Sequence, residues 1–154
     1  MIFSTLISNL ELVANLDCSG WVIVDCRFDM DHPEWGHDQY LENHIPGAVY
    51  AHQNIDLAGK VTPQTGRHPL PEHETLRRRF GDWGITPEIQ VVAYDDSDGS
   101  KASRLWWLLR YYGHTRAAVM NGGLLNWIKG GYPVRPGERQ CVSLGPSPSR
   151  RTGP

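Results

Sequence analysis

Three aspartates and two serines surround a glycine in one short segment of this chain, residues 95–100. Residues 91–94 before it form an apolar run typical of a buried strand, and residues 102–110 after it have the apolar pattern of a helix packed on a sheet. A polar loop between a strand and a helix N-terminus suits an anion, because unpaired amide N–H groups point into it and the helix dipole adds about half a positive charge. An enzyme with this geometry would place its nucleophile at the first loop position. Here that residue is Asp95, a poor nucleophile towards sulfur or phosphorus.

The favoured interpretation is that the loop carboxylates bind the N–H groups and dipole of their own helix. The loop is then a degenerate active site without a catalytic residue, and its members are Asp95, Asp96, Ser97, Asp98, Gly99 and Ser100. The alternative is an aspartyl nucleophile for phosphoryl transfer, although no basic residues next to Asp95 could clamp a phosphate. An EF-hand is excluded, since with Gly99 as the loop glycine the first ligand would be Tyr94 and the twelfth Leu105.

The three cysteines offer no obvious substitute nucleophile. Cys26 ends an apolar strand, where a buried thiol usually behaves as a small inert hydrophobe. Cys18 precedes a turn and Cys141 lies in a polar tail, so none has a helix N-terminus behind it. Their spacing fits neither a disulfide framework nor a zinc site, and the histidines show no metal-ligand spacing. We therefore expect no metal and no cofactor.

Strands alternating with helices surround this loop. Apolar runs predict strands at residues 21–24, 48–51 and 117–120, in addition to 91–94. Helices are predicted from the capping box at Ser8, from Pro71 to Gly84 and over residues 124–129. We expect the residues after Arg27, up to Gln39, to form a loop, and residues 53–70 to form a long ordered one. The alternation predicts a single α/β domain with a central, mainly parallel sheet and helices on both faces.

Composition narrows the class of protein further. A chain of 154 residues, 40% hydrophobic and 21% charged, is long enough for one domain with a core. A net charge of −2 gives no reason to expect a nucleic-acid partner, and no apolar run approaches the roughly 20 residues of a membrane span. The N-terminus lacks the basic region of a signal peptide. We expect a cytoplasmic protein with reduced thiols.

The last nineteen residues differ from the rest in composition. From Pro136 onward the sequence is rich in proline, glycine, serine and arginine and lacks apolar periodicity. We expect residues 1–135 to form the domain and residues 136–154 to be a disordered tail, because too little apolar surface is available to offset the ordering entropy.

With these motifs assembled, residues 5–135 resemble a rhodanese-like domain. The signature His-Ile-Pro-Gly-Ala begins at His44, and Asn-Gly-Gly at residues 121–123, followed by Trp127 and Gly-Tyr-Pro-Val at 131–134, is similar to the family's closing motif. Asp25 corresponds to the aspartate of the family's first strand pattern. The resemblance implies that Asp25, His44, Pro46 and Gly47 are structural signature residues, and it suggests that Asp25 and His44 form a hydrogen-bonded pair.

The sequence Thr-Gly-Arg-His-Pro-Leu-Pro at 65–71 and the loop-helix segment beginning at Asp95 narrow the likeness further. They resemble the N-terminal half of tandem-domain thiosulfate and 3-mercaptopyruvate sulfurtransferases. In that family the second domain carries the cysteine that becomes a persulfide, and the first domain packs against it. The resemblance implies a sulfurtransferase-family chain of the N-terminal type, with Asp95 where a catalytic cysteine would stand and no activity alone. The alternative is a non-catalytic rhodanese-like module for binding or regulation.

The resemblance also implies a partner. A catalytic rhodanese domain would pack on this one, with Trp106 and Trp107 in the core or the interdomain contact, and small anionic sulfur compounds would be reached only through that partner. Residues placed to approach such a substrate are Arg67, His68 and Arg104. No nucleic acid and no membrane is expected as a partner.

Overall fold

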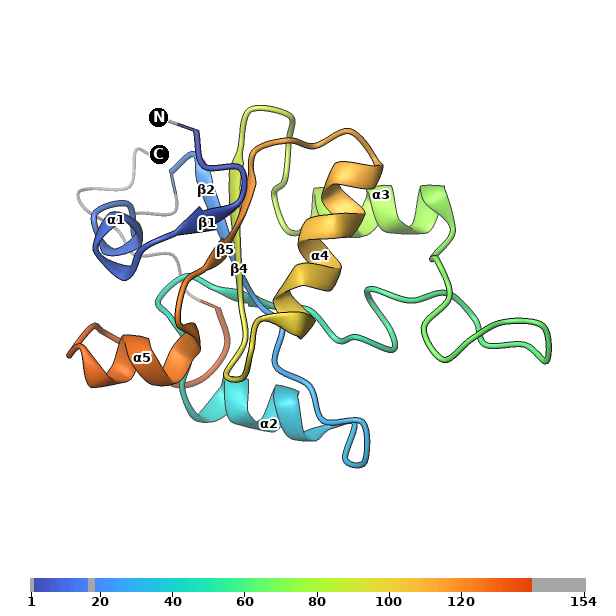
Figure 1. Ribbon diagram of the computed structural model, residues 1–154, viewed down its shortest axis with the longest axis horizontal. Coiled ribbons are helices and arrows are strands. Elements are labelled where there is room, and N and C mark those ends of the chain that lie inside the picture. Colours follow the sequence, from blue (N-terminus) through green and yellow to red (C-terminus); the bar gives the residue numbers. More distant parts are fainter. Residues whose placement is uncertain (1, 17–18, 140–154) are drawn as a thin grey trace, which may run out of the picture.

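The computed structural model describes residues 2–16 and 19–139, which fold around one sheet (Figure 1). Its elements, in chain order, are β1 (Leu6–Ile7), α1 (Asn9–Val13), β2 (Trp21–Asp25), α2 (Trp35–Glu42), β3 (Val49–Tyr50), α3 (His73–Asp82), β4 (Gln90–Tyr94), α4 (Ser100–Tyr111), β5 (Ala117–Met120) and α5 (Gly123–Lys129). The order of strands across the sheet is β1-β5-β4-β2-β3, and the strand pairs of this sheet are all parallel; an isolated bridge outside the strands, between His44 and Arg135, is antiparallel. The prediction of an α/β domain with a parallel sheet is confirmed.

The two apolar runs predicted as interior strands lie side by side at the centre of the sheet. β4 pairs with β2 along its whole length, from Trp21 opposite Gln90 to Asp25 opposite Tyr94, and with β5 on its other side. Every residue of β4 is buried. Because both neighbours of β4 are strands and both faces are covered, a continuous apolar run is the sequence that such a strand requires.

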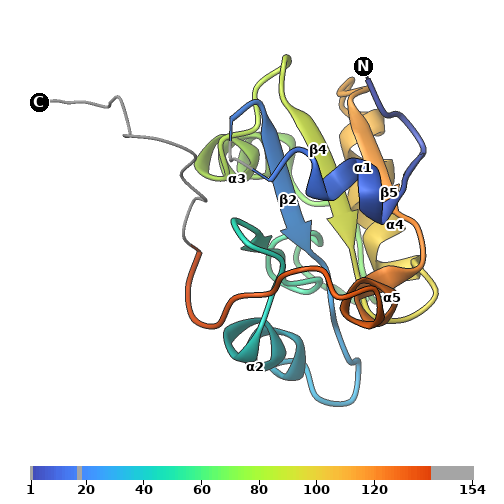
Figure 2. The same ribbon diagram turned by 90° about the vertical axis from the view of Figure 1, so that its left-hand side faces the viewer.

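Alternate residues of these strands supply the cores of the two faces. Val22, Val24 and Ala93 pack with α3 and α4, whereas Ile23 and Val92 pack with side chains from α1, α2 and α5. Figure 1 shows α3 and α4 on one side of the sheet and α1 and α5 on the other, and Figure 2 shows α1 and α5 in front of the strands. The period of two along each strand therefore separates two cores, as expected when helices cover both faces.

The prediction of a loop after Arg27, up to Gln39, is wrong for its second half, because α2 begins at Trp35. The sequence does not predict this helix, because glycine, here Gly36, usually interrupts a helix and Pro33 lies just before it. In the fold, Gly36 is buried against the carbonyl of Arg27, and a Cβ there would collide with that backbone. Gly36 and Tyr40, one turn apart, are the buried face of this helix, so its apolar pattern contains only one large side chain.

Other elements agree with the prediction within a few residues. The capping box at Ser8 is present, with the Ser8 and Glu11 side chains bonding each other's backbone N–H groups at the start of α1. The strand β1 was missed, since its two residues are strand only through their pairing with Val119 and Met120 of β5. In the described part of the chain, no helix is long and apolar enough to cross a membrane.

The start of the segment predicted to be a tail contacts the domain. The Gly137 N–H donates to the carbonyl of Leu41, and the Arg139 guanidinium donates to the carbonyl of Gly47 at 3.0 Å. The rest of that segment, from Gln140, lies outside the described residues, as do Cys18 and Cys141.

We expect the amides of β2 and β4 to be the slowest to exchange with deuterium in the native state. These strands are internal to the sheet and covered on both faces, so their hydrogen bonds open only when much of the domain unfolds. Native-state hydrogen exchange followed by NMR measures this directly. Faster exchange in β2 or β4 than in the edge strand β3 would contradict the topology.

Candidate functional site

The loop that follows β4 is closed around the carboxylate of its own first residue. Asp95 is 1% exposed. Its Oδ1 accepts hydrogen bonds from the backbone N–H groups of Ser97 at 3.0 Å and Gly99 at 3.1 Å, and its Oδ2 accepts one from Ala102 at 2.9 Å. Ala102 lies in the first turn of α4, whose N-cap residue, Gly99, makes no side-chain cap bond. The Asp95 side chain therefore supplies the cap and occupies the amide cup that the sequence predicts.

The backbone around this carboxylate uses glycine where another residue would be strained. Gly99 has φ of 88°, which turns the chain into α4 with its N–H directed at Asp95. Gly123 has φ of 72°, and a Cβ on it would lie 3.1 Å from the carbonyl oxygen of Asp95. That carbonyl accepts a hydrogen bond from Leu124 at 2.8 Å. The start of α5 therefore packs directly on the loop, and the glycines of the closing motif permit this approach.

The other two aspartates of the loop differ from Asp95 in exposure and partners. Asp98 is exposed, and hydrogen bonds from the Ser100 side chain and backbone lower the pKa of its carboxyl. Asp96 is partly buried, which raises its pKa. The charge of Arg27 opposes that shift, while Asp95 and Asp25 reinforce it. Asp96 is thus in electrostatic contact with Asp95, and Asp98 caps the first residue of α4.

A second buried carboxylate stands at the end of the neighbouring strand, β2. Asp25 is fully buried, and Arg27, 4% exposed, binds it through Nη2, 2.7 Å from Oδ2, and through Nε, 3.0 Å from Oδ2 and 3.1 Å from Oδ1. The Tyr94 hydroxyl donates to Asp25 Oδ2 at 2.8 Å and accepts from the Ile45 N–H at 3.1 Å. Arg27 Nη2 also donates to the carbonyl of Asn43. This network joins β2, β4 and the turn of the signature that begins at His44 in one buried cluster.

The suggested pairing of Asp25 with His44 is wrong, because Tyr94 stands between β2 and the turn. The His44 ring is instead within hydrogen-bonding distance of the carbonyls of Ile45, at 2.8 Å, and Gly137, at 3.0 Å. It stacks on Tyr40 with ring centroids 4.2 Å apart. Pro46 and Gly47, the latter at φ of 84°, form the turn that follows. Sequence reasoning also missed Arg27, although the Asp-x-Arg spacing at a strand end was the available signal.

Ionisation of the buried Tyr94 hydroxyl should lower the free energy of unfolding at alkaline pH. Burial, and then the charge of Asp25, raise its pKa well above the ordinary value. A group whose folded pKa exceeds its unfolded pKa contributes stability that is complete below the unfolded pKa, about 10 for tyrosine, and is lost as the pH rises above it. We expect the free energy of unfolding to fall above about pH 10. Replacing Tyr94 with phenylalanine should reduce that slope by about 1.4 kcal/mol per pH unit.

Urea unfolding followed by fluorescence between neutral and alkaline pH provides the measurement. The Tyr94→Phe protein should also lose about 1–3 kcal/mol at neutral pH, because Asp25 and Ile45 lose a partner. Tyr111→Phe, at an exposed position, is the matched control. An alkaline slope unchanged by Tyr94→Phe would contradict the role given to this hydroxyl.

The three residues predicted to approach a substrate are placed differently from one another. Arg104 is partly buried, which lowers its pKa, and its guanidinium donates to the carbonyls of Leu57 at 3.0 Å, His68 at 3.1 Å and Pro69 at 3.2 Å. It therefore fastens the long loop onto α4. Arg67 and His68 lie together in a hollow of about 250 Å³, whose other lining residues are Phe28, Met30, Asp31 and Asn54. Burial, followed by the charges of Arg104 and Arg67, lowers the pKa of His68.

Cys26 is fully buried at the end of β2. Burial, and then the carboxylates of Asp25, Asp95 and Asp56, raise the pKa of its thiol well above the ordinary value. A thiol held protonated in this way is a weak nucleophile. Among the described residues no group of three histidine, cysteine, aspartate or glutamate side chains could hold a metal ion.

Comparison with known proteins agrees with the motifs. The family model for the rhodanese-like domain matches residues 8–129. A probable 3-mercaptopyruvate sulfurtransferase of Pseudomonas aeruginosa is 39% identical over 135 residues, which are 86% of this chain and 48% of that protein. A putative thiosulfate sulfurtransferase of Mycobacterium tuberculosis is 34% identical over 134 residues, 86% of this chain and 47% of that protein.

The fold is also similar to a solved structure of a protein with a related name. The 3-mercaptopyruvate sulfurtransferase from Leishmania major superposes with a TM-score of 0.79 and 30% identity, over 90% of this chain and 38% of that one. This chain thus spans about half the length, or less, of the relatives it matches.

Proposed function

The chain belongs to the rhodanese-like domain family, whose relatives in the comparison are sulfurtransferases, and within that family we propose that it is a non-catalytic half of the two-domain type. The observation that carries the proposal is the hydrogen bonding of Asp95. In a sulfurtransferase the loop amides would stabilise a thiolate or persulfide. Here three of them are bound by a carboxylate of the chain itself.

The charge of the loop supports the same proposal. Thiosulfate and mercaptopyruvate are anions, and Asp95, Asp96 and Asp98 would oppose the approach of either one to the amides. Cys26 cannot replace the missing nucleophile, because its thiol is buried among carboxylates. Sulfur transfer then depends on a second rhodanese domain that brings the cysteine.

We propose that such a partner would cover the exposed apolar side chains on α4 and the hollow beside it. Trp107 and Tyr111 are 44% and 57% exposed, and their rings stack at 5.0 Å between centroids. Arg67 and His68 would face the partner's substrate from the hollow. Arg104 would act indirectly, by holding the loop that carries them.

The chain alone should transfer no sulfur from thiosulfate to cyanide above the uncatalysed rate. The reason is the absence of a thiolate in the amide cup, so raising the thiosulfate concentration should not produce turnover. Thiocyanate formation measured by its coloured iron complex gives the rate. Alkylation of accessible cysteines is the control, and turnover that survives it would overturn the proposal.

A further inference from the structure

An apolar cavity lies at the edge of the sheet opposite to Asp95. It is lined by Ile85, Thr86 and Pro87, which precede β4, and by His114, which precedes β5. Asp95 follows the other end of β4. Because the strands are parallel, their two ends form separate edges, so this cavity does not belong to the loop already described. It measures about 340 Å³.

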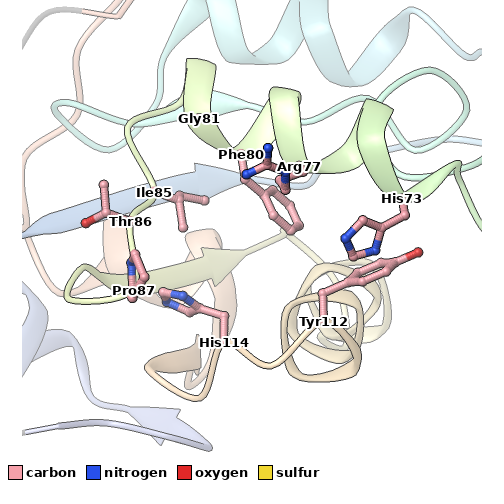
Figure 3. Close-up of a pocket in the computed structure, with 9 residues that line it drawn as sticks. All are labelled: His73, Arg77, Phe80, Gly81, Ile85, Thr86, Pro87, Tyr112 and His114. Atoms are coloured by element: carbon pink, nitrogen blue, oxygen red, sulfur yellow. The ribbon is translucent and has the colours of Figure 1, made fainter.

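The cavity combines an apolar floor with nitrogen-bearing side chains at its rim. Figure 3 shows Phe80 in the middle, with His73 beside Tyr112 at one end and His114 beside Pro87 at the other. His73 and Arg77 project from the same face of α3, one turn apart. The floor suits an aromatic or branched aliphatic group, and the rim suits a negative charge.

The polar groups at the rim differ in what they have left to bind. The His114 Nε2 is 2.9 Å from the carbonyl oxygen of Ile89, and this contact holds the ring in place at the side of the cavity. The His73 ring contacts Tyr112 at 4.6 Å between centroids and has no hydrogen-bond partner in the described part of the chain. Arg77 touches Glu74 at 3.4 Å, with both side chains about 70% exposed, and such a pair is weak. Arg77 and His73 are therefore available as donors.

Among the residues that the structure describes, no acidic side chain lines the cavity. Two carboxylates contact lining residues from outside: Glu74 pairs with Arg77, and Glu88 Oε1 accepts from the Thr86 hydroxyl at 3.3 Å. Arginine stays charged at every physiological pH and binds carboxylates through two parallel hydrogen bonds. From the apolar floor, the arginine and the unpartnered histidine together, we propose that this cavity binds small amphipathic carboxylates, with the apolar part on Phe80 and the carboxylate between His73 and Arg77.

The probe for this site is 3-phenylpropionate, titrated into the ¹⁵N-labelled chain and followed by ¹H–¹⁵N correlation spectra. We expect saturable shifts confined to the cavity residues, with a Kd of about 1 mM, which is ordinary for a ligand of this size. The neutral analogue 3-phenylpropan-1-ol should bind at least about fivefold more weakly, because it lacks the charge that Arg77 recognises.

Two neighbouring arginines provide a matched pair of variants. Arg77→Gln should weaken 3-phenylpropionate binding about fivefold, and His73→Gln should weaken it less. Arg78→Gln removes the same charge from an exposed position that does not line the cavity, and should leave the Kd unchanged. Equal affinity for the acid and the alcohol, equal effects of the two arginine variants, or no saturable shift at the cavity residues would each overturn the proposal. The comparison of the two probes needs only the unmodified chain, so it stands even if a variant fails to fold.

Discussion

The Asp95→Cys protein should form a persulfide with thiosulfate only slowly, and replacing Asp96 with asparagine as well should accelerate it. In the reaction the thiolate attacks the outer sulfur of thiosulfate. A new S–S bond forms, the S–S bond of thiosulfate breaks, and sulfite leaves with the electron pair. The amides of Ser97, Gly99 and Ala102, freed from Asp95, would favour the thiolate, as would the dipole of α4.

The two remaining aspartates of the loop, Asp96 and Asp98, differ in burial and in partners. Asp96 is partly buried and electrostatically coupled to position 95, whereas Asp98 is exposed and bonded to Ser100. A like charge near the thiolate costs about 1 kcal/mol, which corresponds to roughly a fivefold lower rate. We therefore expect Asp96→Asn to raise the rate of persulfide formation several-fold and Asp98→Asn to raise it by less.

Intact-protein mass spectrometry measures the gain of one sulfur atom with time. The experiment is carried out with Cys18 and Cys141 replaced by serine, while Cys26 is left in place because it is buried. The same background with Asp95 intact is the control and should gain no sulfur. If Asp95→Cys alone reacted as fast as the version carrying Asp96→Asn, the loop carboxylates would not be what opposes the chemistry.

Replacing Asp25 with alanine should destabilise the domain more than any substitution in the loop. It would leave the guanidinium of Arg27 buried without a counter-charge, and breaking a buried pair in this way costs about 3–5 kcal/mol. The Tyr94 hydroxyl would lose its acceptor as well. Since single domains are stable by only about 5–15 kcal/mol, this loss would remove a large share of the free energy of unfolding.

Urea unfolding of the variant and the parent gives the difference in free energy. Glu74→Ala, which removes one partner of an exposed pair, is the control and should change the stability by less than about 0.5 kcal/mol. The double variant Asp25→Asn with Arg27→Met removes both charges, and it should be more stable than Asp25→Ala. A double variant less stable than Asp25→Ala would show that the buried charge is not the cause.

Elements with a strong local pattern could be predicted from the sequence, and those defined by distant contacts could not. The run from Val91 to Tyr94 is apolar because both of its faces are covered. Its burial could therefore be predicted from these residues alone. Leu6 and Ile7 become a strand only by pairing with β5. The buried face of α2 is a glycine and a tyrosine, and a glycine that permits close packing looks in sequence like one that breaks a helix.

In the candidate site, too, features set by local sequence could be predicted and those set by distant contacts could not. The place of Asp95 follows from its position between a strand and a helix, so the carboxylate in the amide cup was foreseeable. The role of Arg27 was missed, because its Asp-x-Arg spacing also fits a surface arginine after a strand, and only the fold shows the side chain turned back onto Asp25. The sequence also could not show that the donors of Arg104 bind loop carbonyls, because those contacts join residues far apart in the chain.

The place of β1 has a consequence for how the chain folds during synthesis. Leu6 and Ile7 are synthesised before the rest of this domain, yet their pairing partners in β5 are made only after nearly the whole domain. Until then β1 has no strand to join, and the β4 edge that β5 will cover stays open. The nascent domain therefore closes late, and a pause in translation before residue 117 would prolong the time in which that open edge can aggregate.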